Sequence, residues 1–323
     1  MTQEIKTISR EAGGTSKGYT LQKLRSISLI LKEIEKDKDL DFVAAIEYGG
    51  DVYIGNNHYN YVEENKAYDS KNFSFVSDPI KNTLVYFLDY WLKNNKDSKI
   101  IFGIFCTNNI AKENNGGFIK EKGIDLPENK IIESLQSKNY SDNKTIEAAK
   151  QILLHEYKRQ YEKNKRFPIE SSFYKVIEAF STEEWKIFFN TIDWVFSGTS
   201  LEKLEEQVLE QIIKSNFATP ENLKFKAPFI RAELFYQLEL RQNKEKTEDR
   251  FLTKKDIEII FLRAVSGDIN EESYKYLNID YTEIRDKTQR FLTEFINRKY
   301  FAVTGFRNPP IYFQEMLSQS IRI

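Results

Sequence analysis

The chain has 323 residues, with 48 Lys and Arg, 49 Asp and Glu, two His and one Cys. This length allows two domains, and the balanced charge excludes a uniformly basic coat for nucleic acid but allows a local basic cleft beside acidic residues. A single cysteine excludes an intrachain disulfide and a thiolate zinc site, so any metal is expected to be Mg²⁺ or Mn²⁺ held by carboxylates.

The first predicted element is an amphipathic helix over residues 19–36. Apolar residues recur there at three- and four-residue steps, at Leu21, Leu24, Ile27, Leu31 and Ile34, which is the spacing of one helix face. The period then changes. A short apolar run at 42–46, the pair Gly49-Gly50 and a second run opening at Asp51 predict a hairpin. A third strand is predicted over 59–68.

A second helix is predicted to begin at Ser77-Asp78-Pro79, because a capping residue followed by proline is typical of a first turn. Residues 100–106 are apolar on both faces and predict a buried strand. This is the longest apolar run and is too short to cross a bilayer. The first 14 residues lack the apolar core of a signal peptide, so a cytoplasmic protein with no membrane partner is expected.

The remaining chain is predicted to be mostly helical. Residues 107–145 are polar and loop-rich, and helical patterns follow over 145–164, 171–180, 182–196, 200–215, 226–242, 253–265 and 281–299. We therefore expect an α/β core of restriction-endonuclease-like order (αβββαβ) over residues 1–125. An α-helical domain over 126–323 would serve partner docking or oligomerisation, or simply form a helix bundle. Its basic stretch, from Lys158 to Arg166, would track a phosphate backbone or form a solvated helix face.

The third strand carries the candidate chemistry. Side chains alternate along a strand, so Glu64 and Lys66 share one face and Glu63 points to the other. Asp51 opens the preceding strand and is expected to meet Glu64 across the hairpin. Two converging carboxylates repel each other unless a cation lies between them. The sequence therefore predicts a metal site of Asp51 and Glu64 with a neighbouring ammonium from Lys66.

This trio is what metal-dependent phosphodiester cleavage requires. Asp51 and Glu64 would hold Mg²⁺ or Mn²⁺, and Lys66 would stabilise the developing charge or position the attacking water. The alternative is a solvated strand with a salt bridge on one face. Glu47 is either an accessory metal ligand or a solvated turn carboxylate, and Gln22 either helps to orient the site or is a surface glutamine.

Three segments resemble a known family: Gly18–Gln22 (GYTLQ), Ile46–Val52 (IEYGGDV) and Val62–Lys66 (VEENK). The pattern D…(D/E)xK on successive strands is typical of PD-(D/E)xK nucleases. Together the segments resemble the double-stranded DNA endonuclease domain of bacterial anti-phage systems, described as a CBASS effector (cyclic-oligonucleotide-based anti-phage signalling) and found in Lamassu operons. The resemblance implies the catalytic set Asp51, Glu64 and Lys66, supported by Glu47 and Gln22.

The resemblance also implies a function and partners. A nuclease domain with a helical second half is most similar to the nuclease subunit of a Lamassu-type complex. The implied partners are double-stranded DNA, an SMC-like ATPase and an accessory subunit, with a homo-oligomer as the active form. Two alternatives stay open at this point: a nuclease of the same fold that acts on RNA, and a catalytically silent scaffold subunit.

Overall fold

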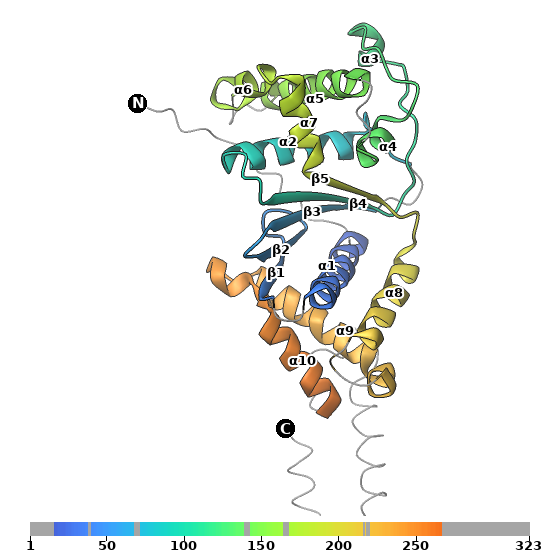
Figure 1. The fold of residues 1–323 in the computed structure, drawn as a ribbon, viewed down its shortest axis with the longest axis vertical. Helices are drawn as coiled ribbons and strands as arrows, with labels where there is room; N and C mark the ends of the chain where they lie inside the picture. Colours follow the sequence, from blue (N-terminus) through green and yellow to red (C-terminus); the bar gives the residue numbers. More distant parts are fainter. Residues whose placement is uncertain are drawn as a thin grey trace, which may run out of the picture.

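A six-stranded mixed sheet forms the centre of the molecule (Figure 1). The computed structural model describes residues 16–37, 40–67, 72–138, 143–163, 168–215, 217 and 220–266. The strands are β1 (Phe42–Ile46), β2 (Val52–Asn56), β3 (Asn60–Lys66), β4 (Ile100–Cys106), β5 (Ile192–Phe196) and β6 (Leu252–Thr253). Their spatial order is β5-β4-β3-β2-β1-β6.

The directions of the strands bring several strand ends to one edge of the sheet. β1, β2 and β3 form an antiparallel meander, whereas β4 and β5 run parallel to β3. In this register Lys66, Cys106 and Phe196 are aligned at the carboxyl ends of three neighbouring strands. The turn between β1 and β2 lies at the same edge, because Val52 pairs with Glu63. Ends of five strands, β1 to β5, therefore lie close together there.

Helices cover both faces of the sheet (Figure 1). On one face lie α1 (Ser16–Lys36), α8 (Leu201–Lys214), α9 (Pro220–Gln242) and α10 (Lys254–Ser266). On the other lie α2 (Asp78–Lys93), α3 (Phe118–Glu121), α4 (Ile131–Gln136), α5 (Asn143–Lys163), α6 (Tyr174–Glu178) and α7 (Thr182–Asn190). Two short 3-10 helices, η1 (Ile169–Ser171) and η2 (Thr247–Arg250), complete the described elements.

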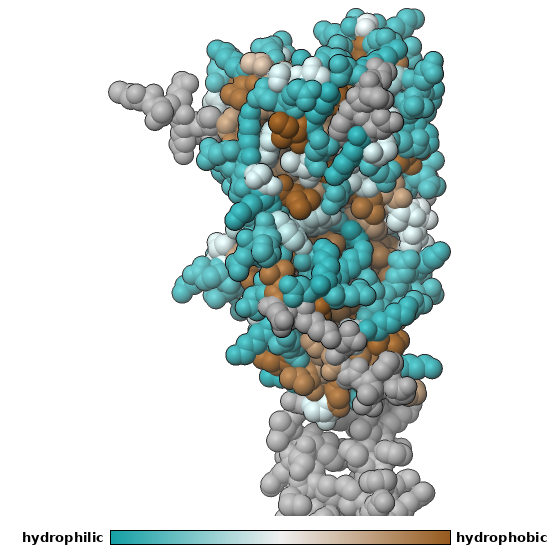
Figure 2. Space-filling model, in the orientation of Figure 1, coloured by the Kyte–Doolittle hydropathy of each residue, from teal (hydrophilic) through white to brown (hydrophobic). Residues whose placement is uncertain are grey.

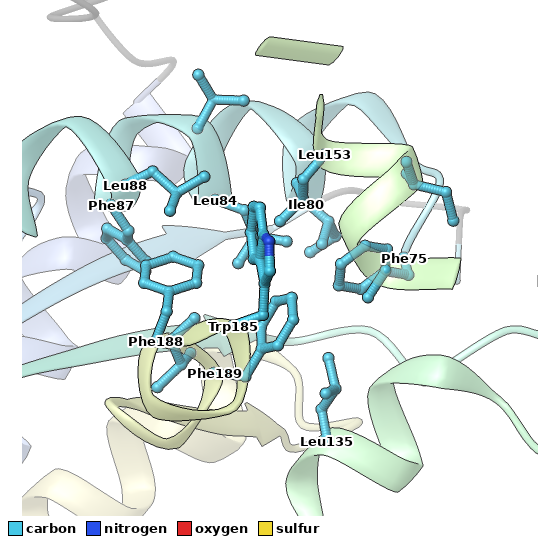
Figure 3. Close-up of a cluster of buried hydrophobic side chains, with 14 of the residues drawn as sticks. Phe75, Ile80, Leu84, Phe87, Leu88, Leu135, Leu153, Trp185, Phe188 and Phe189 are labelled. Atoms are coloured by element: carbon cyan, nitrogen blue, oxygen red, sulfur yellow. The ribbon is translucent and has the colours of Figure 1, made fainter. Parts of the chain in front are cut away.

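The core under α2 is rich in aromatic side chains, as Figure 3 shows. Phe87 of α2 stacks on Phe102 of β4 with ring centroids 4.4 Å apart, and Trp185 of α7 stacks on Phe189 at 5.8 Å. All four side chains are fully buried. Removing such a group from water stabilises the fold by about 1.5–3 kcal/mol. Trp91 of α2 also contacts Phe188 of α7, with ring centroids 5.5 Å apart, so this core joins the first half of the chain to helices of the second half.

The core under α1 is aliphatic. The predicted helix face is confirmed, since Leu21, Leu24 and Ile27 are at most 1% exposed. They pack with α8, α9 and α10 against the sheet. In the view of Figure 2 the surface is mostly hydrophilic, and the hydrophobic groups gather toward the end where α10 lies. None of the helices in the described ranges is both long and apolar enough to cross a membrane.

The predicted order of helix, three strands, helix and strand is confirmed, and residues 42–46 and 100–106 have the predicted bounds. The helix predicted over 182–196 is wrong in its last third. A capping box between Ser181 and Glu184 starts α7, which ends at Asn190, and the following run Ile192–Phe196 pairs with β4 as strand β5. A short apolar run fits either state, and the open edge of β4 selects the strand.

The second half of the chain is mostly helical, as predicted, but it is built into the same sheet. β5 and β6 are its two outermost strands. The helices that follow residue 126 pack into the core under α2 and into the core under α1. Within the predicted basic stretch, Lys158 and Arg159 pair with Glu162 and Glu156. The helix predicted over 281–299 lies outside the described residues.

Candidate active site

The β1–β2 turn at the sheet edge is tightly held. Glu47 has a φ of 54° and Gly49 a φ of 66°, both in the left-handed region. A side chain at Gly50 would lie 2.8 Å from Val62 Cγ1 of β3, so only glycine allows this approach. The Tyr86 hydroxyl of α2 donates to the Gly49 carbonyl. The turn is thereby fixed against β3 on one side and α2 on the other.

Glu64 and Lys66 lie on the same face of β3, as alternation predicts. Lys66 Nζ lies 2.8 Å from Glu64 Oε2, and their side chains are 16% and 19% exposed. This face continues from Val62, which is buried in the core under α2. The pair is thus partly buried, and water or a ligand can still reach it.

Asp51 lies between α1 and the end of β3. Its Oδ1 accepts a hydrogen bond of 2.6 Å from Gln22 Nε2, and its Oδ2 accepts one of 2.6 Å from the backbone amide of Asn65. Asn65 stands between Glu64 and Lys66 in sequence. The carboxylate of Asp51 is therefore fixed beside the predicted pair, in the place that the hairpin register gives it.

The charges of the three predicted residues influence one another. Burial and the nearby Glu64 carboxylate raise the pKa of Asp51 from an ordinary value of 3.8 to about 7, against the opposite effect of Lys66. Burial alone would lower the pKa of Lys66, but the carboxylates of Glu64 and Asp51 raise it above its usual range. Lys66 is therefore an ammonium group at neutral pH, whereas Asp51 is present there in both its protonated and its ionised form.

Gln22 and Glu47 join this group. Gln22 is 7% exposed, so the prediction of a surface glutamine is wrong. Its Nε2 donates to Glu47 Oε1 at 2.9 Å as well as to Asp51 Oδ1. Glu47 also raises the pKa of Asp51. The structure thus brings together all five residues that the sequence singled out.

Glu63 lies on the opposite face, as predicted, and has a different environment. It is fully buried, and its two oxygens accept hydrogen bonds of 2.9 Å from Arg25 of α1. The Tyr61 hydroxyl adds a third at 2.9 Å. Sequence reasoning missed Arg25, although its position three residues after Gln22 places both on one side of α1. The available signal was a positive charge beside Leu24 and Ile27 in the predicted apolar stripe of this helix.

The residues present suit a hard cation. Asp51 and Glu64 offer carboxylate oxygens, which are the ligands that Mg²⁺ prefers, and Mg²⁺ commonly binds through one or two carboxylates and keeps several waters. Burial and, to a smaller extent, the neighbouring Glu64 carboxylate raise the pKa of Asp51, and a bound cation would offset the repulsion between the two carboxylates. In the part of the chain that the structure describes, no three His, Cys, Asp or Glu side chains form a ready metal cage. A metal here would thus need water or substrate oxygens to complete its shell.

The pockets of the described residues do not mark this site. One of about 180 Å³ is lined by residues such as Leu31, Gln211 and Lys254, toward the other end of α1 from Gln22, and one of about 230 Å³ lies near Phe217 and Phe261. Neither contains a concentration of catalytic side chains, so the polar cluster at the end of the sheet is the better candidate for an active site.

No protein family model matches the sequence. A search of curated proteins also finds no significant match.

Proposed function

We propose that this chain is a divalent-metal-dependent nuclease of the PD-(D/E)xK type that hydrolyses phosphodiester bonds of double-stranded DNA. The observation that carries the proposal is the convergence of Asp51, Glu64 and Lys66 at one sheet edge, with Lys66 2.8 Å from Glu64. The order of helix, three strands, helix and strand around them supports it. Glu64 and Lys66, which belong to a tripeptide pattern that is common by chance, lie here in a cluster of two carboxylates and an ammonium group at the end of the sheet that carries the β1–β2 turn.

Each residue has a separate role in the proposal. Asp51 and Glu64 hold Mg²⁺ or Mn²⁺, and Asp51 is oriented for this by Gln22 and the Asn65 amide. The bound metal supplies Lewis acidity toward a phosphate oxygen and lowers the pKa of a coordinated water. Lys66 stays protonated beside Glu64. It stabilises the negative charge that develops on the phosphate or positions the attacking water.

The bland alternative for the pair of Glu64 and Lys66 is a structural salt bridge. Three details favour chemistry instead. The pair is partly exposed at the end of the sheet. The neighbouring Asp51 has a raised pKa. Two further polar residues, Gln22 and Glu47, lie beside Asp51. Ordinary surface ion pairs contribute only about 0–1 kcal/mol to stability and need no such surroundings.

Plasmid, linear duplex DNA and RNA, digested in parallel with Mg²⁺, Mn²⁺ or EDTA, test the proposal. We expect metal-dependent cleavage of the duplex DNAs that is lost in Glu64→Ala and Lys66→Ala. Glu128→Gln, a change of an exposed glutamate outside the site, is the matched control. If the chain cleaved RNA but not duplex DNA, RNA would replace DNA as the proposed substrate. Unchanged cleavage in both site variants would refute the active-site assignment and leave a silent scaffold as the better reading.

We also propose a biological setting, which rests on the resemblance of Gly18–Gln22, Ile46–Val52 and Val62–Lys66 to anti-phage nucleases. The chain would act as the effector subunit of a defence complex with an SMC-like ATPase and an accessory subunit, and would oligomerise when active. Co-purification of the chain with products of neighbouring genes tests these partners. Loss of phage protection in Glu64→Ala would tie the activity to defence.

A further inference from the structure

A group of aromatic side chains lies beside the β1–β2 turn. The ring of Tyr48 meets the rings of Tyr53 and Phe251 edge to face, with centroids 5.0 Å and 4.9 Å away. The centroids of Tyr53 and Phe251 are 5.8 Å apart. Tyr90 of α2 lies against the turn itself, because a Cβ added at Gly49 would be 3.2 Å from Tyr90 Cε2. We call Tyr48, Tyr53, Tyr90 and Phe251 the aromatic patch.

The hydrophobic cores account for only half of the aromatic patch. Tyr53 and Tyr90 pack at the rim of the core under α2. Among the described residues, the side chains that pack against either core do not include Tyr48 or Phe251. All four side chains remain partly exposed. The patch therefore leaves apolar ring surface in contact with water, which is typical of a binding surface rather than of a core.

The aromatic patch lies on the same face of the sheet as the candidate active site. Tyr53 pairs with Val62 of β3, and Val62 shares its face of β3 with Glu64. Tyr48 stands in the turn itself, three residues before Asp51. Successive nucleotides of one strand are covalently joined. A strand whose phosphate lies at Glu64 and Asp51 therefore brings a neighbouring base toward the patch.

The chemistry of the patch suits a base rather than a phosphate. Burial and the neighbouring tyrosines raise the pKa of Tyr53 to about 12, and burial with Tyr48 also raises the pKa of Tyr90. These rings are therefore uncharged at neutral pH. Phosphates are bound by cationic side chains and hydrogen-bond donors, whereas aromatic rings stack on bases of any sequence. In a continuous duplex the neighbouring base pairs cover both faces of a base, so only an unpaired base can stack on protein.

We propose that the aromatic patch stacks on one or two unpaired bases next to the phosphate that is cleaved. This inference rests on the proposed nuclease function and narrows its substrate class to duplex DNA that is locally unpaired, as in a bubble, a flap or a frayed end. The phosphate lies at Asp51, Glu64 and Lys66, and the adjacent base lies on the patch. A continuous duplex must first open, so we expect it to be bound more weakly and cleaved more slowly.

Equilibrium binding to three DNA duplexes of equal length tests the patch. The first is fully paired, the second has a central bubble of unpaired bases, and in the third the bubble is abasic. Both bubbles carry the same phosphates, so the ratio of their Kd values isolates base stacking. With Ca²⁺ in place of Mg²⁺, we expect the wild type to bind the bubble with bases about tenfold more tightly than the abasic bubble, equal to about 1.4 kcal/mol.

Variants of the patch should change this ratio. Tyr48→Leu and Phe251→Leu retain apolar bulk but remove a flat ring, and each should lower the ratio severalfold. Tyr48→Phe retains the ring and should retain the ratio. Tyr174→Ala, which removes a partly exposed tyrosine outside the patch, is the matched control. The ratio does not depend on how much of a variant is folded, so partial misfolding cannot produce the expected result.

The outcomes separate the stacking surface from the nuclease function. Equal affinity of the wild type for the two bubbles, or an unchanged ratio in both leucine variants, would overturn the stacking surface even if DNA is cleaved. A ratio that falls in the leucine variants, without cleavage of DNA or RNA by the wild type, would support the stacking surface and overturn the nuclease function. A wild-type chain that binds none of the three DNAs would overturn both.

Discussion

The two faces of strand β3 treat neighbouring glutamates in opposite ways. Glu63 is fully buried and accepts three hydrogen bonds, two of them from Arg25. Glu64 is partly exposed and lies beside Lys66. The first carboxylate is saturated by its own protein, whereas the second has room for another ligand. Both residues are glutamates. What distinguishes the one that stabilises the fold from the one that can act on a substrate is whether its oxygens already have hydrogen-bond partners within the protein.

The largest effect on stability is expected at Glu63. Glu63→Ala would leave the Arg25 guanidinium buried without its carboxylate, at a cost of about 3–5 kcal/mol. Glu64→Ala should cost less than about 1 kcal/mol, because its pair is partly solvated. Urea unfolding of both variants measures the difference. If Glu63→Ala does not fold, Glu63→Gln replaces it in the comparison. Equal urea midpoints for the Glu63 and Glu64 variants would contradict the predicted difference in stability.

For DNA cleavage we expect the reverse order, with a larger loss for substitution of Glu64 than for substitution of Glu63. Glu64→Gln is expected to lower the rate of DNA cleavage at least about 100-fold, since it weakens metal binding and removes a charge beside Lys66. Glu63→Gln should retain the cleavage rate at a temperature where circular dichroism shows it folded, because Glu63 faces away from the site. Initial rates on a plasmid substrate check this. Equal losses in both variants would show that the two faces are not functionally distinct.

The dependence of stability on pH tests the raised pKa of Asp51. Its pKa in the folded chain is about 7, above the ordinary value of 3.8. The folded state therefore keeps this proton longer than the unfolded state does, and stability is lost as pH rises from about 4 to 7. Asp51→Asn does not titrate. It should gain stability relative to the wild type over this window, by on the order of 4 kcal/mol, and the gain should level off above pH 7.

Melting temperatures in EDTA across this window measure the effect. The loss of one hydrogen bond in Asp51→Asn shifts all values equally, so the slope with pH is the diagnostic quantity. Mg²⁺ or Mn²⁺ should raise the melting temperature of the wild type most above pH 7, where Asp51 is ionised. A difference between variant and wild type that does not change with pH would contradict the assigned pKa.

The smallest effect is expected at the support of the turn. Tyr86→Phe removes the hydroxyl that donates to the Gly49 carbonyl. The expected cost is about 1 kcal/mol of stability, with a cleavage rate several-fold lower because the turn that carries Glu47 and Asp51 is held less firmly. Thermal unfolding and the cleavage rate at saturating DNA check this. A variant that matches the wild type in both would show that Gly50 and Val62 fix the turn alone.

Sequence patterns predicted the first part of the fold because its elements are strongly periodic. The helix over 19–36 has one apolar stripe, and residues 42–46 and 100–106 are short apolar runs bounded by polar residues. The pairing of Glu64 with Lys66 follows from strand alternation, which is a local property. The sequence also singled out Gln22 and Glu47 as candidates to support the site, and the structure places Gln22 in hydrogen-bond contact with both Glu47 and Asp51.

The errors occurred where a long-range contact determined the local structure. Ile192–Phe196 was predicted as the end of a helix, but it pairs with β4, which is far away in the sequence. β6 has two residues and exists only because β1 offers a free edge. The predicted division of the chain at residue 125 was drawn from local patterns alone, and two strands from the later part, β5 and β6, belong to the same sheet as β1 to β4. Periodicity contains no information about which edge is open.

The trio at the sheet edge is therefore partly a property of the sequence and partly one of the tertiary structure. The sequence by itself determined that Glu64 and Lys66 share a face, because strand geometry fixes it, and it placed Asp51 at the start of the adjacent strand, which begins one residue later at Val52. Only the tertiary structure decided that α1 brings Gln22 between Asp51 and Glu47 while Arg25 neutralises Glu63. Those contacts join residues 25 to 38 positions apart, and packing of α1 on the sheet sets their distances.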